Sequence, residues 1–207
     1  MNTEASAVPS KRTLRGRYDA STIRVYQAYT KEISERAVAA GTFVPPFKRE
    51  RMTWIKPSFL WMMYRSGWAT KPGQERVLAI DITREGLEWA LSRSTLSHFC
   101  PDLHESREDW QAMVSESPVR VQWDPDRSLD LKPLDVRAIQ IGLSGEAVKR
   151  YVENWIVSIT DITEMVHEIH SSARLGHVAK AEERLPLEVP YPLPELIRRR
   201  ISADSVD

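Results

Sequence analysis

Cysteine is nearly absent from this chain of 207 residues, which contains Cys100 and no other. A single cysteine excludes any disulfide within the chain and is typical of a protein in a reducing compartment. The sequence also lacks any run that approaches the ~20 apolar residues of a membrane-spanning helix. Residues 1–17 are polar and lack the apolar stretch of a signal peptide. We therefore expect a cytoplasmic protein without a membrane partner.

An excess of charge of either sign is absent as well, because 29 Lys and Arg residues balance 29 Asp and Glu residues. This balance argues against nucleic-acid binding by bulk charge, although it is compatible with a local basic groove. The sequence also contains no G-x-G-x-x-G, G-x-x-x-x-G-K-[ST], H-E-x-x-H or G-x-S-x-G motif. These absences argue against a Rossmann dinucleotide site, a P-loop NTPase, a zincin protease and an α/β-hydrolase.

The chain does have enough apolar sequence for a core, at 42% hydrophobic residues, and its seven tryptophans are many for this length. Tryptophan is mostly a packing residue, but it also provides stacking surfaces for bases and cofactors. The length suits one domain with tails. We expect a flexible basic arm over 1–17, a single α+β domain over 18–176, and a charged, proline-rich C-terminal extension with a short helix over 177–207.

Hydrophobic periodicity predicts a mixture of strands and helices. The expected strands are 23–29, 77–82, 119–123 and 136–143. The expected helices are 30–41, 57–67, 83–94, 144–159, 163–175 and a short helix from Pro194. We expect an irregular segment over 98–117 and a turn over 124–127. This order lacks the regular alternation of a doubly wound sheet, so it predicts an α+β fold with a mixed or mostly antiparallel sheet and packed helices.

The segment from Arg51 to Trp68 has the densest set of candidate functional residues. Lys56 lies immediately before an expected helix start, where free backbone N–H groups and the helix dipole favour an anion. Ser58 in the first turn adds a hydroxyl donor, and Arg51 and Arg65 could neutralise a phosphate. So many polar groups are unusual for a buried structural helix, which favours an anion site. The structural alternative is that Arg65 caps its own helix.

Aromatic and amide side chains could complete such a site. Trp54, Trp61 and Tyr64 could stack on a base or a nicotinamide, although each one singly is more typical of a core residue. Gln140 and Gln27 each lie on an apolar face of an expected strand. A buried glutamine must find hydrogen-bond partners in the protein or in a ligand.

Metal binding is not expected. Two groups of residues have spacings that could bring metal ligands together: His98, Cys100 and His104, and Glu164, His167 and His170. Neither group is accompanied by a second ligand pair, and both are more typical of a solvated face or a capped loop.

Several runs of the sequence resemble the domain-of-unknown-function family numbered 4291. They are 25–29 (VYQAY), 51–68 (RMTWIKPSFLWMMYRSGW), 74–80 (QERVLAI), 121–125 (VQWDP) and 139–143 (IQIGL). The resemblance extends from about Tyr18 to Ile169, and the long tryptophan-rich run is its most specific part. The family name carries no assigned activity.

A more distant resemblance is to the ADP-ribosyltransferase superfold. It implies a split, mostly antiparallel sheet with a cleft for NAD, and it maps residues by their order along the chain. Arg24 or Arg51 would take the role of an early basic residue, and Trp61 or Tyr64 that of the aromatic beside the nicotinamide. Gln140 stands about where a catalytic glutamate is expected. A glutamine could bond a ribose hydroxyl, but it cannot stabilise an oxocarbenium ion by charge.

Two functional hypotheses follow from these residues. The first is a nucleotide-phosphate-binding enzyme, such as an NAD-dependent ADP-ribosyltransferase, with Gln140, Arg51 and Tyr64 in catalytic roles. Its cofactor would be held by Arg24, Lys56, Ser58, Trp61, Arg65 and Gln27. The alternative is a non-catalytic nucleotide- or RNA-binding module that uses the same groove and shows salt-sensitive binding without turnover. A protein-interaction domain is a third option, which predicts a large exposed apolar patch.

Overall fold

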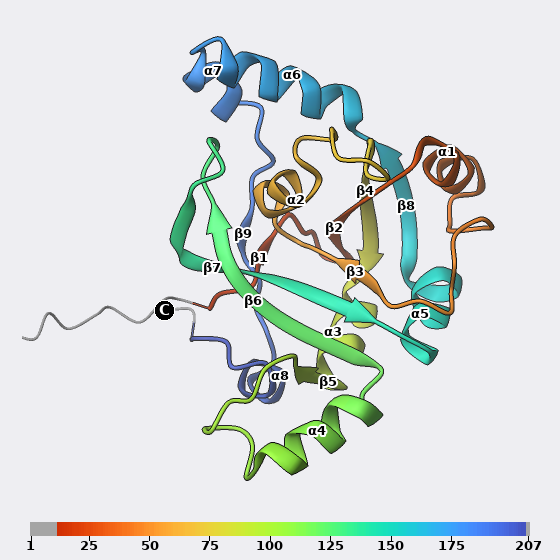
Figure 1. The fold of residues 1–207 in the computed structure, drawn as a ribbon, viewed down its shortest axis with the longest axis vertical. Coiled ribbons are helices and arrows are strands. Elements are labelled where there is room, and N and C mark those ends of the chain that lie inside the picture. The colour runs from red at the N-terminus through yellow and green to blue at the C-terminus, as the bar shows by residue number, and fades with distance from the viewer. Residues whose placement is uncertain (1–11, 206–207) are drawn as a thin grey trace, which may run out of the picture.

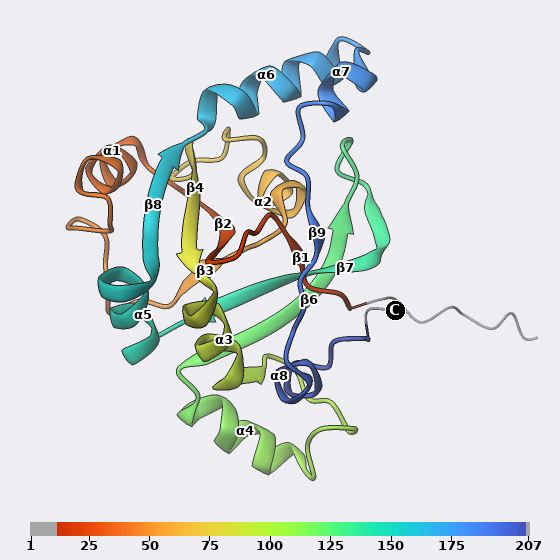
Figure 2. The ribbon, with the colours of Figure 1, turned by 180° about the vertical axis from the view of Figure 1, so that it is seen from behind.

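The computed structural model describes residues 12–205, which form two principal β-sheets with helices packed around them (Figures 1 and 2). The first sheet has the order β2-β4-β8, with β2 (Thr22–Tyr29), β4 (Arg76–Thr83) and β8 (Ile156–Asp161). The second has the order β3-β7-β6-β5, with β3 (Thr53–Ile55), β7 (Pro133–Leu143), β6 (Val119–Arg127) and β5 (Ser94–Leu96). Neighbouring strands are antiparallel except β5 and β6. The predicted α+β class is therefore confirmed.

The two sheets are joined at one point, where β2 meets the end of β3. The Tyr26 backbone N–H donates to the Lys56 carbonyl oxygen over 2.8 Å, and the Lys56 N–H donates back to the Tyr26 carbonyl oxygen over 3.3 Å. This bridge fixes the backbone at Lys56, within the segment from Arg51 to Trp68 that has the densest set of candidate functional residues. It also places the side chains of Gln27 and Lys56 in the same region, because they lie next to each other across the junction.

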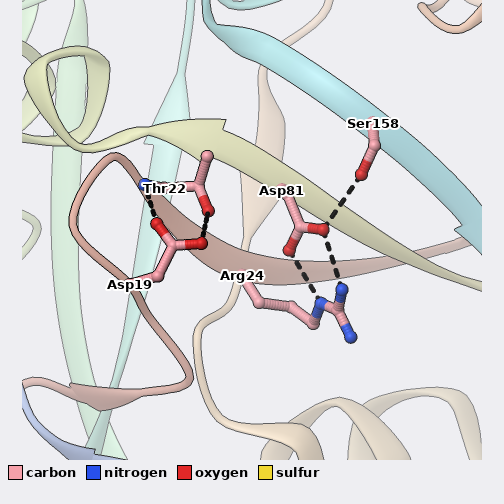
Figure 3. Close-up of polar contacts among 5 residues, drawn as sticks. All are labelled: Asp19, Thr22, Arg24, Asp81 and Ser158. Carbon is pink, nitrogen blue, oxygen red and sulfur yellow. Dashed lines mark hydrogen bonds and ion pairs between the residues drawn. The ribbon is translucent and has the colours of Figure 1, made fainter.

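A polar network crosses the three strands of the first sheet (Figure 3). Arg24 on β2 donates two hydrogen bonds to Asp81 on β4, from Nε over 2.8 Å and from a terminal nitrogen over 2.7 Å. Ser158 on β8 donates to the same carboxylate over 2.9 Å. Paired groups of this kind suit the half-buried face of a sheet, since each charge has a hydrogen-bonded partner. β4 itself is the central strand, as predicted, and its run 77–80 is buried.

Helices pack at both ends of the molecule and between the sheets. Their bounds are α1 (Lys31–Ala40), α2 (Phe59–Ser66), α3 (Arg84–Ser92), α4 (Arg107–Glu116), α5 (Glu146–Arg150), α6 (Thr163–Arg174), α7 (Val178–Glu182) and α8 (Glu195–Arg200). α6 and α7 lie at one end and α4 and α8 at the other (Figures 1 and 2). α2 packs against both β2 and β6, so it contacts a strand of each sheet.

Several predicted helix ends are confirmed by capping geometry. Gly41 and Gly67 follow α1 and α2 with φ angles of 68° and 59°, a left-handed conformation that glycine adopts without strain. Thr83 caps α3 by accepting the Gly86 backbone N–H at its side-chain oxygen over 3.1 Å. The start of α2 differs from the prediction, because Pro57 precedes the helix and Ser58 is its N-cap.

The prediction of one long helix over 144–159 is wrong. α5 continues as a π-helical turn, η1 (Tyr151–Trp155), and the chain then enters β8 at Ile156. The run 156–160 is rich in β-branched residues and pairs with the central strand β4. Apolar residues in so short a run fit both a helical and an alternating period, so strand pairing decides the outcome.

The expected turn over 124–127 is also wrong, because β6 continues to Arg127 opposite β7. The pairing register shifts between Pro125 and Arg127, and this irregularity accommodates a proline that cannot donate to the ladder. The chain reverses instead over 128–132, where the Ser128 N–H donates to the Lys132 carbonyl oxygen over 3.0 Å. Within 98–117, expected to be irregular, α4 forms without a single buried residue. Such a helix has no apolar stripe to reveal it.

The expected terminal tails belong to the same domain where the structure describes them. β1 (Arg15–Gly16) pairs with β9 (Val189–Pro190), and Leu14 is buried. Trp123 donates its indole N–H to the Ile201 carbonyl oxygen over 2.7 Å. The arm predicted over 1–17 is thus part of the fold from Arg12 onward, and its residues 1–11 lie outside the described range. The C-terminal extension likewise contacts the second sheet, where a guanidinium nitrogen of Arg200 donates to the Ser94 carbonyl oxygen over 3.2 Å.

Gly86 gives a direct test of this packing. A Cβ atom added to Gly86 on α3 would lie 2.4 Å from Cγ of Trp155, so the indole ring must move. We expect Gly86→Ala to lower the free energy of unfolding by about 1–3 kcal/mol, although alanine favours a helix by about 1 kcal/mol. Urea denaturation measures the difference. Glu85→Ala, at the exposed neighbouring position, is the control, and equal losses in the two variants would contradict the packing described.

Candidate functional site

A cavity of about 560 Å³ opens where the two sheets meet. Its polar lining consists mainly of cations and amides, namely Lys48, Arg51, Lys56, Arg65, Gln27, Gln74, Gln122 and Gln140. Its aromatic lining residues are Tyr29, Phe47 and Trp54. No aspartate or glutamate is among the described residues that line it. The cavity therefore concentrates positive charge in a chain whose formal net charge is zero.

The structure brings six of the predicted candidates to this cavity: Gln27, Arg51, Trp54, Lys56, Arg65 and Gln140. They come from β2, the segment around β3, α2 and β7, so the site depends on the junction of the sheets. Sequence patterns could not reveal Lys48, Gln74 or Gln122 as neighbours of these residues. Gln122 lies opposite Gln140 in the β6–β7 pair.

The floor of the cavity is a closed hydrogen-bond network centred on Gln27. Its Nε2 donates to Thr53 Oγ1 over 2.6 Å and to the Tyr29 hydroxyl over 2.9 Å. Its Oε1 accepts from the Tyr151 hydroxyl over 2.8 Å. These bonds use both ends of the amide, and Gln27 is 3% exposed. Gln27 therefore positions the floor of the cavity. The hydrogen-bond partners expected for a buried glutamine are mostly protein groups here.

Gln140 and Gln122 hold a carboxylate beside the cavity. The Gln140 Nε2 donates to Asp124 Oδ2 over 2.7 Å, and the Gln122 Nε2 donates to Asp124 Oδ1 over 3.0 Å. Asp124, expected to shape a turn, lies instead in β6 with both oxygens bonded to neutral amides. This arrangement keeps the carboxylate occupied and fixes the orientation of both glutamines.

Lys56 is the most unusual group in the cavity. It is 5% exposed, and its Nζ donates one hydrogen bond, to the Trp54 carbonyl oxygen over 3.2 Å. No ion pair with a described carboxylate is formed by its ammonium group. Burial, followed by repulsion from Arg65, lowers the Lys56 pKa from 10.5 to about 7, and Asp124 opposes this shift. The amine thus titrates near neutral pH.

Arg51 and Arg65 stand at the open side of the cavity. Both are exposed, and neither guanidinium forms a hydrogen bond or ion pair with another residue of the range 12–205. Arg65 does not act as a cap for α2, whose end is closed by Gly67. Two arginines without partners next to a buried amine form a surface that can bind an anion bidentately.

Four predicted site residues lie elsewhere, namely Arg24, Trp61, Tyr64 and Ser58. Arg24 is bonded to Asp81 in the network across the first sheet (Figure 3). Trp61 and Tyr64 stack on each other at 5.1 Å, and Arg127 lies 3.7 Å from the centre of the Tyr64 ring. These residues are absent from the cavity lining, because they project from other faces of β2 and α2. Among the aromatic residues that line the cavity, Trp54 is the nearest to Trp61 and Tyr64 in the sequence.

Ser58 belongs to a second polar cluster at the start of α2. Its hydroxyl donates to Asp126 Oδ1 over 2.9 Å and accepts the Trp61 backbone N–H over 3.2 Å. The Phe59 backbone N–H donates to Glu188 Oε1 over 2.7 Å. Burial raises the pKa of Glu188 to about 8, and it also raises the pKa of Asp126. The helix start predicted to bind an anion is therefore occupied by carboxyl groups of the protein itself.

The histidines do not gather into a site. His104 accepts the Cys100 backbone N–H at Nδ1 over 2.9 Å, and His170 stacks on Trp68 at 5.0 Å. Across the part of the chain that the structure describes, no group of three His, Cys, Asp or Glu residues could hold a metal ion. Within the same range, no helix is both long and apolar enough to cross a membrane.

Comparison with known families identifies the class of this protein. The model of a family described as "Domain of unknown function (DUF4291)" matches residues 13–191. The chain therefore belongs to this family, as its tryptophan-rich run suggested. A comparison with curated proteins finds no match. Because the family description assigns no activity, the function must be argued from the chemistry of the cavity.

Replacement of Lys56 tests the electrostatics of the cavity. The Lys56 pKa is about 7 in the folded protein and 10.5 in the unfolded chain. Between these two pH values the unfolded lysine is protonated and the folded one is not. The resulting loss of stability is complete below pH 7 and disappears as the pH rises to about 10.5. We expect Lys56→Met to raise the free energy of unfolding at pH 6 by an amount on the order of a few kcal/mol. Denaturation at pH 6 and pH 10 measures this, with Lys149→Met as control. A variant less stable than the parent at pH 6 would contradict it.

Glu188→Gln tests the second polar cluster, where the effect on stability is expected at high pH instead of low pH. A carboxyl whose pKa rises from 4.5 to about 8 on folding destabilises the protein above pH 8 and has no such effect below pH 4.5. The variant keeps an acceptor for the Phe59 N–H, so we expect it to be more stable than the parent at pH 9, by an amount on the order of 1 kcal/mol for this partly exposed side chain. The gain should vanish at pH 5. Denaturation of the exposed control Glu182→Gln should show no such dependence, and a gain confined to pH 5 would sink the account.

Proposed function

We propose that the cavity binds the phosphate groups of a nucleotide. The observation that carries this proposal is the lining itself: four cations, four amides and no carboxylate. Burial lowers the Lys56 pKa most in this cavity, and repulsion from Arg65 lowers it further. A bound phosphate reverses that repulsion and restores the proton to Lys56, so binding and protonation favour each other.

The remaining lining suits the rest of a nucleotide. Trp54, Phe47 and Tyr29 provide aromatic surface for a base, and the volume is within the range of small-molecule sites, ~300–1,000 Å³. With Nε2 directed at Asp124, the Gln140 amide would meet a ribose hydroxyl through Oε1. Of the three stacking candidates in the sequence, Trp54, Trp61 and Tyr64, this proposal keeps Trp54, which lines the cavity.

The specific activity we propose is an NAD-dependent reaction like that of ADP-ribosyltransferases. The distant sequence resemblance supports it, and so does a cleft at the junction of two mostly antiparallel sheets. Arg51 would bind a phosphate, and Gln140 would orient the ribose. Asp124, held directly behind Gln140, supplies a negative charge close to the position that the superfold gives to a glutamate. No metal is needed for this chemistry.

The alternative is a module that binds a nucleotide or RNA without turnover. The glutamine at position 140 favours it, because a neutral amide cannot act as a base or stabilise a cation by charge. The unpaired Arg51 and Arg65 serve either function equally. Consumption of NAD separates the two hypotheses, since the binding module leaves the ligand intact.

Ligand-induced thermal shifts test the proposal. NAD or ADP-ribose at 100 times its dissociation constant should add about 2.7 kcal/mol to the stability of the fold. Replacing Arg51 and Arg65 together by alanine removes two charged contacts and should weaken affinity by about two orders of magnitude. The matched control is Lys149→Ala with Arg174→Ala, which removes two positive charges away from the cavity. Product analysis then reports turnover.

Each outcome of this screen has a defined meaning. A shift with NAD or ADP-ribose that the arginine pair abolishes and the control retains supports the proposal. A shift with short RNA alone, lost at higher salt, supports the binding module. Absence of a shift with every nucleotide and with RNA contradicts both and favours a protein-interaction domain.

A further inference from the structure

We propose that Lys56 is an amine nucleophile that forms an imine with the aldehyde carbon of a phosphorylated sugar held in the cavity. The inference deepens the proposed function and rests on it, because Arg51 and Arg65 are the groups that would bind the phosphate. It assigns to Lys56 a covalent role in addition to its charge, and it defines the ligand class as a sugar phosphate or a nucleoside-diphosphate sugar with a free reducing end.

The position of Lys56 is fixed by its backbone. Both its N–H and its carbonyl oxygen are bonded to Tyr26, and Pro57 follows directly. The side chain is 95% removed from solvent in the folded protein, yet it lines the cavity. Its Nζ donates one hydrogen bond, to the Trp54 carbonyl oxygen. The other N–H groups of this nitrogen have no acceptor among the described protein groups. A fixed amine of this kind needs little ordering before reaction.

The charges around Lys56 favour the neutral amine. Burial and, after it, repulsion from Arg65 lower its pKa to about 7, so part of the amine carries a lone pair at neutral pH. A phosphate bound by Arg51 and Arg65 shifts this equilibrium towards the ammonium form, and the attack on the aldehyde proceeds through the remaining neutral fraction. Asp124, the one carboxylate that opposes this shift, is bonded to two glutamine amides. Arg51 and Lys48 also line the cavity, and both are cationic. Desolvation beside another cation is a recognised way to activate a lysine toward carbonyl carbon.

The reaction is balanced without a further reagent. The Lys56 lone pair attacks the aldehyde carbon, and the carbonyl oxygen takes up the proton that the nitrogen loses, giving a carbinolamine. The hydroxyl group then leaves as water together with the remaining N–H proton, and a C=N bond forms between Nζ and the sugar carbon. ADP-ribose and ribose 5-phosphate have such an aldehyde in their open forms. NAD has none, because its ribose carbon is bonded to nicotinamide, so it binds without forming an imine.

Reductive trapping tests the inference. The protein is incubated with ribose 5-phosphate and cyanoborohydride, which reduces the C=N bond to a stable amine, and modified peptides are located by mass spectrometry. At pH 7, labelling at Lys56 should exceed that at the exposed Lys149 by about a hundredfold. NAD should protect Lys56. Lys56→Arg should abolish the adduct and keep the charge, and Arg65→Gln should reduce labelling at pH 7 because the amine becomes more basic.

The outcomes separate this inference from the proposed function. Labelling that is no stronger at Lys56 than at Lys149, in a protein that still shows a thermal shift with NAD, overturns the imine and keeps the nucleotide site. Equal labelling of Lys56 by ribose and by ribose 5-phosphate overturns the phosphate-bearing ligand class and counts against the proposed function. Strong, phosphate-dependent labelling at Lys56 that NAD blocks supports both.

Discussion

Two backbone hydrogen bonds between Tyr26 and Lys56 join the two sheets of this domain where β2 meets the end of β3. Each sheet places part of its polar surface beside this junction: Gln27 from the first, and Gln122 and Gln140 from the second. α2 begins three residues beyond Lys56, at Phe59, and contacts a strand of each sheet, so it closes the region and contributes Arg65. The cavity is formed where these elements meet.

A consequence of this geometry is that a lysine is buried without a carboxylate partner. Burial of an unpaired ammonium group is costly, and a protein avoids that cost by pairing the charge or releasing the proton. Lys56 does the second, with a pKa near 7, while the neighbouring Asp124 is bonded to amides. The cavity therefore contains an amine that can gain a proton when a negative charge comes close. The cluster around Glu188 and Ser58 shows the opposite design, in which the protein supplies its own acceptor at the helix start.

The sequence was a good guide where local chemistry decides. It predicted the α+β class, the central strand around Ile80, and the helix ends at Gly41 and Gly67, because periodicity and glycine conformation are local properties. It failed at 144–159, where pairing with β4 selects a strand from an ambiguous pattern. Long-range pairing also explains why β6 extends through Pro125 and why the termini join the fold.

The candidate site shows the same division. Clustered cations around Lys56 and isolated glutamines on apolar strands were visible in the sequence and meet at the cavity. The sequence could not predict on which side of the fold Trp61, Tyr64 and Arg24 lie, because this depends on the directions in which α2 and β2 pack. The hold of Gln122 and Gln140 on Asp124 depends on the β6–β7 register, which no local pattern specifies.

The most direct test of the central claim is the proton uptake that accompanies ligand binding. Calorimetric titration of the protein with NAD at pH 7, in two buffers that differ in ionisation enthalpy, measures the protons taken up per site. Because Lys56 is about half deprotonated in the empty cavity, binding of the diphosphate should take up about half a proton. The same titration of Lys56→Met should show almost none. Binding of NAD without proton uptake, or no binding at all, would contradict the account of a basic cavity built to receive phosphate.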